Sequence, residues 1–329
     1  MRRLLFILLF FVLVASCGTG LWYWSYLTTA SPGSGEVIVV ISKGTGVRGI
    51  GSLLAENGIL RYDIRYLVLV HFSRLTAKLQ AGEYSIPRGL TPPAVLRLLE
   101  KGSTLRHHVT IPEGMTVEQV AAIFEKDGWV KRERFLAIVH DVEFIKKIGI
   151  DAQQLEGYLF PETYTLIRHE TDEYSVIRMM VERFLHVWNE IKPDKLSGLN
   201  RHQLVTLASV VEKETGATAE RPLIARVFLN RLARKMPLQS DPTVIYGIRE
   251  FKGDLTKADL KRATPYNTYV IPALPPGPIC NPGRASLEAV LHPADSNALY
   301  FVSKNDGTHV FSTSLAEHNR AVKTFQRSP

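Results

Sequence analysis

The sequence predicts an α+β protein that is attached to a membrane by its N-terminus. Three observations support this fold class: an uncharged apolar segment opens the chain, three copies of a strand–turn–helix pattern follow, and the remainder reads as helices with one hairpin. Because 329 residues exceed the size of one ordinary core, we expect several domains. We place a membrane anchor at residues 1–30, a small α/β subdomain at 36–105 and a mainly helical domain at 106–329.

The anchor is predicted from residues 4–27, which contain no charged side chain. About 20 apolar residues are enough to cross a bilayer once. Arg2 and Arg3 precede the segment and are expected to stay in the cytoplasm, so the rest of the chain lies outside it, in the periplasm if an outer membrane exists. The residues before Cys17 also resemble a lipoprotein processing box. We favour the uncleaved single-pass anchor because apolar residues continue well past Cys17.

The charge balance indicates an acidic partner. The formal net charge is +8, which suits nucleic acid, anionic lipid or an anionic polymer. The sequence contains no run of five Lys or Arg residues and no zinc-finger or RNA-binding signature, so nucleic acid is not expected. Cys17 and Cys280 are the only cysteines, and we expect no structural disulfide.

Three segments share one pattern, in which a strand ends at a glycine turn, an apolar helix pattern follows and a second glycine closes it. The copies begin at residues 41–44, 86–89 and 111–114. Gly44 also starts a Gly-x-Gly-x-x-Gly pattern, which we interpret as a turn and not as a phosphate cradle, so no cofactor is expected. The first two copies resemble a LysM-like module, a type associated with N-acetylglucosamine polymers that also serves as a spacer.

The rest of the chain is predicted to be mainly helical. A long proline-rich segment interrupts the helices, and structureless segments of this length are usually functional. The predicted elements are helices over much of 130–200, a helix over 201–215, a helix over 221–235, the proline-rich loop at 264–285 and a hairpin turning at Asp306 and Gly307.

Two glutamates stand in the last turn of the 201–215 helix, although this helix reads as largely buried. On a helical wheel both Glu212 and Glu214 point into the apolar arc, about 160° apart. We expect Glu212 to pair with one of the arginines that follow, which are Arg221, Arg226 and Arg231. Ser209 and Lys213 share the remaining face, which we expect to be solvated.

Glu214 is the candidate catalytic acid. Apolar neighbours raise the pKa of a carboxyl above its usual value of about 4.3, and the negative end of a helix dipole disfavours its ionisation further. Such a carboxyl holds a proton near neutral pH, as a general acid must. The alternative is a buried ion pair with an arginine, which would keep Glu214 ionised.

Five motifs carry a resemblance to a known family. In order along the chain they are "LEGYLFPETY", "QLVTLASVVEKET", "LQSDPTVIYG", "TPYNTY" and "LPPGPICNPG". Together they resemble the endolytic murein transglycosylases, the YceG-like proteins. The resemblance implies a peptidoglycan lytic transglycosylase that cleaves the β-1,4 link between N-acetylmuramic acid and N-acetylglucosamine in nascent glycan strands and ends their growth beside the synthases. It also implies a lysozyme-like helical region with Glu214 as catalytic acid.

The chemistry that the resemblance implies needs one carboxylic acid. Glu214 would protonate the leaving oxygen, the C6 hydroxyl of muramic acid would attack C1 to form a 1,6-anhydro ring, and Glu214 would take up the hydroxyl's proton. We expect no metal, because the sequence holds no H-E-x-x-H motif and its ten histidines are scattered. We expect each histidine to belong to ordinary surface or core.

Other motif residues are candidate substrate contacts, because aromatic faces and amides suit sugars with N-acetyl groups. They are Glu156, Gln239, Ser240, Asp241, Tyr246, Tyr266, Asn267 and Tyr269. The tyrosines can instead pack the proline-rich loop, and Asp241 can cap a turn. Two other functions stay open: a peptidoglycan-binding scaffold without catalysis, and a hydrolase in which Asp241 or Glu156 directs water.

Overall fold

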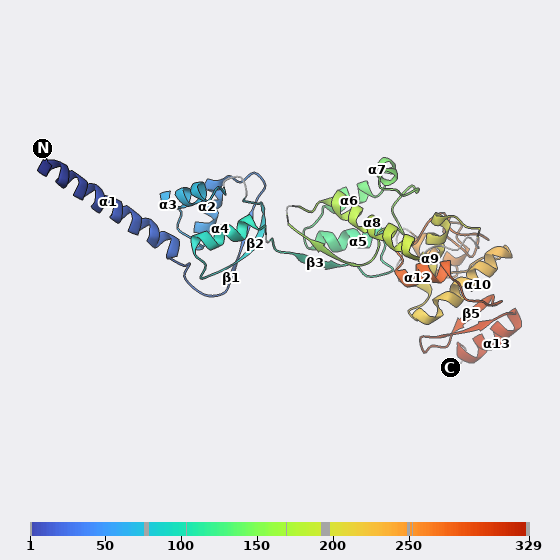
Figure 1. Cartoon of the computed structure of the whole chain (residues 1–329). Coiled ribbons are helices and arrows are strands. Elements are labelled where there is room, and N and C mark those ends of the chain that lie inside the picture. Colours follow the sequence, from blue (N-terminus) through green and yellow to red (C-terminus); the bar gives the residue numbers. More distant parts are fainter. Residues whose placement is uncertain are drawn as a thin grey trace. The chain divides into compact units, whose positions relative to one another are not determined.

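The chain folds into two compact units (Figure 1). Its mixed α/β content is the one that the sequence predicts. The first unit comprises Met1–His108 and Thr165–Thr171, and the second comprises Val109–Tyr164 and Asp172–Pro329. The computed structural model describes residues 2–75, 79–102, 104–168, 170–191, 198–248, 251 and 253–326.

The first unit is built around one antiparallel strand pair with helices between its strands. Val39 of β1 lies opposite Tyr84 of β2, and both side chains are almost completely buried. Ile50, Leu54 and other apolar side chains of the intervening elements complete this core. The elements are α1 (Arg2–Thr28), β1 (Glu36–Ile41), α2 (Val47–Glu56), α3 (Ile64–Phe72), β2 (Gly82–Pro87) and α4 (Pro92–Glu100).

Helix α1 is long and apolar enough to cross a membrane. Its segment Leu5–Thr28 has a mean hydropathy of 2.3, and no part of its most apolar window is buried within the protein. The C-terminal end of α1 contacts the rest of the first unit, because the Tyr26 hydroxyl donates to the carbonyl of Arg61. The guanidinium of Arg65 lies 4.8 Å from the centre of the Trp22 ring. These features are compatible with a single-pass anchor.

The predicted repeat is confirmed in its backbone. The three turn glycines and the three closing glycines all have positive φ angles, which side-chain-bearing residues rarely adopt. The turn glycines precede α2, α4 and α5 (Val117–Lys126). Gly44 therefore serves a turn, and β1 pairs antiparallel with β2, whereas a dinucleotide-binding unit uses parallel strands. The six residues are Gly44, Gly89 and Gly114 at the turns and Gly58, Gly102 and Gly128 at the helix ends.

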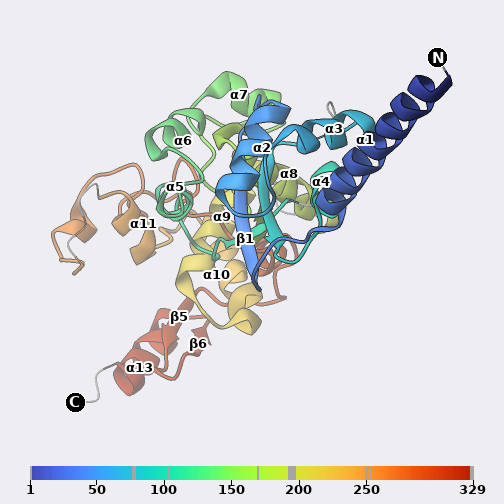
Figure 2. The same ribbon diagram turned by 90° about the vertical axis from the view of Figure 1, so that its left-hand side faces the viewer.

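The second unit consists mainly of helices. Figure 2 shows α5, α6 and α7 grouped in one part of this unit and β5, β6 and α13 in another. Strands β3 (His107–Thr110) and β4 (Thr163–Leu166) pair with each other, and their residues divide between the two units. The further elements are α6 (Arg132–Ile138), α7 (Val142–Lys147), α8 (Glu173–Ile191), α9 (Arg201–Glu214), η2 (Thr218–Glu220), α10 (Arg221–Ala233), α11 (Asp241–Tyr246), η3 (Asp259–Lys261), α12 (Arg284–Leu291), β5 (Tyr300–Ser303), β6 (His309–Ser312) and α13 (Leu315–Phe325).

Helix α9 is the central helix of the second unit and contacts α10, α11 and α12. It begins at a capping box, in which Asn200 accepts from the Gln203 amide and the Gln203 side chain accepts from the Asn200 amide. Residues 204–211 are all buried. The prediction of a solvated face at Ser209 is therefore wrong. The Ser209 hydroxyl accepts from the Ile279 amide at 3.0 Å, because the proline-rich loop covers this side of the helix.

Candidate active site

Glu214 is the last residue of α9, and the chain leaves the helix at Thr215 with φ −146° and ψ 138°. Its carboxyl is partly buried, and this burial raises its pKa to about 7. The nearby Asp241 carboxylate raises the pKa as well, whereas the hydrogen bond from Ser240 lowers it. The position at the negative end of the helix dipole also opposes ionisation. A carboxyl in this setting can hold a proton at neutral pH.

A cavity of about 360 Å³ opens in front of Glu214. Gln239 and Asp241 line it together with Glu214, and so does Tyr269 from the proline-rich loop. The β5–β6 hairpin and α13 supply further lining side chains. The structure thus places four of the nine predicted site residues around one cavity. In the described part of the chain, no group of three His, Cys, Asp or Glu side chains is placed to hold a metal ion.

The segment that carries Gln239 and Ser240 is held rigidly beside Glu214. The Ser240 hydroxyl donates to Oε1 of Glu214, and its backbone amide donates to the Thr268 hydroxyl at 3.0 Å. Gln239 has φ 52°, a conformation that is uncommon for a residue with a side chain. Strained backbone of this kind persists only where the surroundings fix it, and such positions cluster at functional sites. Ser240 is almost completely buried, so it positions Glu214 and does not face the cavity.

Arg231 brings a buried positive charge to the cavity without neutralising Glu214. Its guanidinium donates to the carbonyls of Leu299 at 2.7 Å and Leu238 at 2.8 Å, and those bonds hold it in place. Among the described residues, none forms an ion pair with Glu214 within 4.0 Å. The structure therefore does not support the alternative, in which an ion pair with an arginine keeps Glu214 ionised.

Glu212 has the structural role that the sequence predicts. Its Oε1 accepts from Arg221 at 3.0 Å, and its Oε2 accepts from the Gly283 amide at 2.9 Å. The side chains of Glu212 and Arg221 are only 5% and 8% exposed. This buried pair joins the end of α9 to the start of α10 and to the loop before α12. The two glutamates of α9 therefore differ completely in environment.

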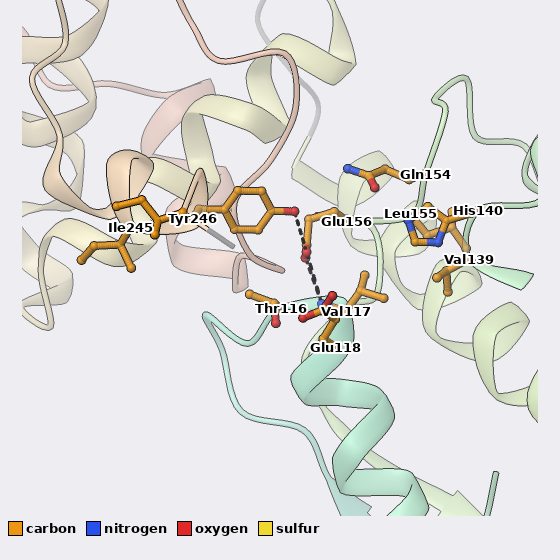
Figure 3. A pocket seen from close by; sticks show the side chains of 11 residues that line it. Thr116, Val117, Glu118, Val139, His140, Gln154, Leu155, Glu156, Ile245 and Tyr246 are labelled. Atoms are coloured by element: carbon orange, nitrogen blue, oxygen red, sulfur yellow. Dashed lines mark hydrogen bonds between the residues drawn. The ribbon is translucent and has the colours of Figure 1, made fainter. Parts of the chain in front are cut away.

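Glu156 and Tyr246 line a second cavity, which also measures about 360 Å³ (Figure 3). The carboxyl of Glu156 accepts from the Val117 amide at 3.1 Å and from the Tyr246 hydroxyl at 3.1 Å. The Asn281 side chain donates to it as well, at 3.3 Å. Burial raises the pKa of Glu156 to about 8 in spite of these donors. The sequence grouped Glu156 with Glu214, but the two carboxyls open into different cavities.

The pKa of Glu156 predicts how stability changes with pH. Unfolding lowers this pKa to about 4.3, so between that value and about 8 the folded protein holds a proton that the unfolded chain has lost. The stability that Glu156 contributes therefore falls as pH rises through this window. In a Glu156→Gln variant this contribution disappears, and its melting temperature relative to the parent should rise from pH 5 to pH 8. The control is Glu125→Gln, on the exposed side of α5, whose melting temperature should change with pH as that of the parent does. If the melting temperature of Glu156→Gln also changed with pH in parallel with the parent, the raised pKa of Glu156 would be contradicted.

The remaining predicted contacts belong to the proline-rich loop. Tyr266 packs against Tyr246, with ring centres 4.8 Å apart, but it does not itself line the second cavity. The Tyr269 hydroxyl donates to Asp241 at 2.6 Å at the first cavity. Asn267 is completely buried, and its amide donates to the carbonyl of Arg262 at 2.7 Å and to two others. We assign Asn267 a structural role in the loop, which corrects its prediction as a substrate contact.

Sequence reasoning missed three residues that shape the two cavities. Arg231 was considered only as a possible ion-pair partner of Glu212 or Glu214, and His309 was expected to be ordinary surface or core. Asn281 was not considered, although its carbonyl oxygen accepts from the amides of Gly157 and Leu159 at 3.0 and 2.8 Å. The one sequence signal that could have pointed to His309 was the predicted hairpin, to whose side chains no function was assigned.

Comparisons with known proteins agree with the motifs. The model of the YceG-like family matches residues 39–324. The endolytic murein transglycosylase of Bacillus subtilis (strain 168) is 33% identical over 308 residues, which cover 88% of this chain and 84% of that protein. The endolytic murein transglycosylase of Streptococcus pneumoniae (serotype 2, strain D39) is 31% identical over 318 residues, and the match covers 87% of this chain but 58% of that longer protein.

One solved structure is similar as well. It is the crystal structure, at 2.6 Å, of a YceG-like protein from Listeria monocytogenes. The two folds superpose with a TM-score of 0.60 at 30% sequence identity, and the match covers 87% of this chain and 98% of that chain.

Proposed function

Because the family match spans most of its length, this chain belongs to the YceG-like family, and we propose that it is an endolytic murein transglycosylase. Its substrate is the glycan strand of peptidoglycan, and its reaction is a lytic cleavage within that strand. One observation carries the proposal for the site: Glu214 presents a carboxyl with a pKa of about 7 to a cavity, with no cation paired to it among the described residues.

Glu214 acts as the general acid of this reaction. It donates its proton to the oxygen of the β-1,4 link as the bond to C1 of N-acetylmuramic acid breaks. The C6 hydroxyl of the same sugar attacks C1, so a 1,6-anhydro ring forms and no water enters the product. The nearby Asp241 supports the acid role, because its negative charge raises the pKa of Glu214. A carboxylate at this position also stabilises the positive charge that develops on the sugar.

The second cavity binds a more distant part of the same strand. Tyr246 ends α11 and Asp241 begins it, so this one short helix supplies a side chain to each cavity. Six helical residues span roughly 9 Å, a separation that suits neighbouring sugars of one polymer. The rings of Tyr246 and Tyr266 offer apolar faces, and the amide of Gln154 offers polar groups for N-acetyl sugars.

The apolar N-terminal helix supports a location of this activity at the membrane. The apolar α1 is the single-pass anchor, and Arg2 and Arg3 keep its N-terminus in the cytoplasm. The catalytic unit then works outside the cytoplasm on nascent strands, beside the synthases whose products it terminates. The order β1–α2–α3–β2, with antiparallel strands, supports a LysM-like module. This module is either a holder of N-acetylglucosamine units or a spacer.

Product analysis tests the function. The full-length protein in detergent micelles should convert uncrosslinked glycan strands into fragments with 1,6-anhydro ends, internal as well as terminal links being cut. Mass spectrometry distinguishes these ends from the reducing ends that a hydrolase leaves, which are heavier by one water. Reducing ends would show that the protein is a hydrolase and not a lytic transglycosylase. Glycan that is bound but not digested would support the alternative function, a peptidoglycan-binding scaffold without catalysis.

A further inference from the structure

A histidine that lines the Glu214 cavity is held in place by a glutamate behind it. His309 begins β6, and Glu220 ends η2, the short turn that follows α9. Nδ1 of His309 lies 2.7 Å from Oε2 of Glu220, and the His309 backbone amide donates to Oε1 at 2.9 Å. Their side chains are 12% and 16% exposed. Two bonds to one carboxylate fix both the position and the orientation of the imidazole.

The second nitrogen of this imidazole remains available for chemistry. Because Nδ1 donates to a carboxylate, the neutral ring carries its lone pair on Nε2. Among the described residues none hydrogen-bonds to Nε2, and the atom is not one of the fully buried polar atoms. The ring of Phe301 contacts the imidazole edge-on, at 5.5 Å between centres. His309 lines the same cavity as Glu214.

Glu214 has only one oxygen free for the reaction. Ser240 donates to Oε1, and in the described part of the chain no other hydrogen bond to the carboxyl is found. Oε2 alone would have to give a proton to the leaving oxygen and collect one from the C6 hydroxyl. Those two transfers involve different sugar oxygens, so a single carboxylate oxygen has to perform them one after the other. A second base in the cavity removes this constraint.

We propose that His309, held by Glu220, is a catalytic base that accepts the proton of the C6 hydroxyl while Glu214 protonates the leaving oxygen. This assignment rests on the proposed function and changes the sequence-based expectation that Glu214 performs both transfers. As O6 bonds to C1, its proton passes to Nε2. As C1 releases the glycosidic oxygen, that oxygen receives the proton of Glu214. The enzyme is left with an imidazolium and a carboxylate, and transfer of one proton through solvent restores both.

Other charged and titratable groups around the pair are compatible with this division of roles. Arg231 from α10 and Asp241 from α11 also line the cavity, with opposite charges. His318 from α13 lines it too, but burial and then Arg231 lower the pKa of His318 and keep that ring neutral. Glu220 gives His309 a carboxylate partner, and no such partner of His318 is found among the described residues.

The split between kcat and KM separates a base from a merely structural histidine. Parent activity should fall above about pH 7 as Glu214 loses its proton. A His309→Gln variant should lose about 10²-fold in kcat with little change in KM. A Glu220→Gln variant removes the charge but leaves an acceptor for Nδ1, so it should lower kcat less than His309→Gln does and leave KM nearly unchanged. His186→Gln, an exposed residue of α8, is the matched control and should behave as the parent.

All variants are assayed as full-length protein in detergent micelles, by the initial rate of anhydro-end formation and by melting temperature. Parent-like kcat in a folded His309→Gln would overturn the proposal and leave the proposed function intact. If His309→Gln does not fold, a parent-like kcat in Glu220→Gln has the same consequence. A parent that produces no anhydro ends, with Glu214 intact, would overturn the function and this inference together.

Discussion

Glu214→Gln is expected to lower the rate of glycan cleavage by about 10²–10⁴-fold, the factor that a positioned general acid supplies. The amide has the size of the carboxyl, and its oxygen can still accept the hydrogen bond from Ser240. It has no acidic proton for the leaving oxygen, so protonation is lost while geometry is kept. The initial rate of anhydro-end formation at pH 6, below the pKa of about 7, measures this loss where the parent's acid form dominates.

A folded variant is required for this test. The melting temperature of Glu214→Gln should match or exceed that of the parent at pH 8, because the parent then carries an ionised and partly buried carboxylate. Glu288→Gln on α12 is the control, since its side chain is 46% exposed and lies outside both cavities. A Glu214→Gln protein that cleaves glycan as fast as the parent would exclude Glu214 as the acid.

The features that the sequence predicted well are set within a few residues. The glycine turns need only a positive φ at one position, and α9 needs only its apolar arc and a cap to begin where it does. The pairing of Glu212 with Arg221 spans nine residues. Residues close in sequence determine the glycine turns, helix α9 and the Glu212–Arg221 pair. Periodicity and turn chemistry were therefore sufficient to predict these three features.

The remainder of the site depends on contacts between distant parts of the chain. Ser240 reaches Glu214 across 26 residues, and His309 reaches Glu220 across 89. No periodic pattern marks a histidine that begins a short edge strand, and only the fold brings it to the cavity. The position of Glu156 depends on distant contacts as well. Its motif suggested a shared site with Glu214, but Asn281, 125 residues away, and the start of α5 hold it at another cavity.

Arg221→Met is expected to destabilise the protein by about 3–5 kcal/mol, because it leaves a buried carboxylate without its charge partner. The Glu212 side chain is 5% exposed, and after the substitution only the Gly283 amide still donates to it among the partners found here. For units of this size each kcal/mol lowers the melting temperature by about 2–4 °C. Tryptophan fluorescence on heating follows the change, since Trp129 and Trp188 are buried in the second unit.

Two further variants decide whether the loss comes from the unpaired charge. Combining Arg221→Met with Glu212→Met replaces the whole pair by apolar side chains, and this exchange should recover most of the stability. Arg284→Met removes an exposed arginine that pairs with Glu190 and Glu288, and it should leave the melting temperature nearly unchanged because solvent screens such pairs. A double variant as unstable as Arg221→Met alone would show that packing of the arginine, and not its charge, holds α9 to α10. The position of Glu214 depends on that junction, because Glu214 ends α9 and the chain continues directly into η2 and α10.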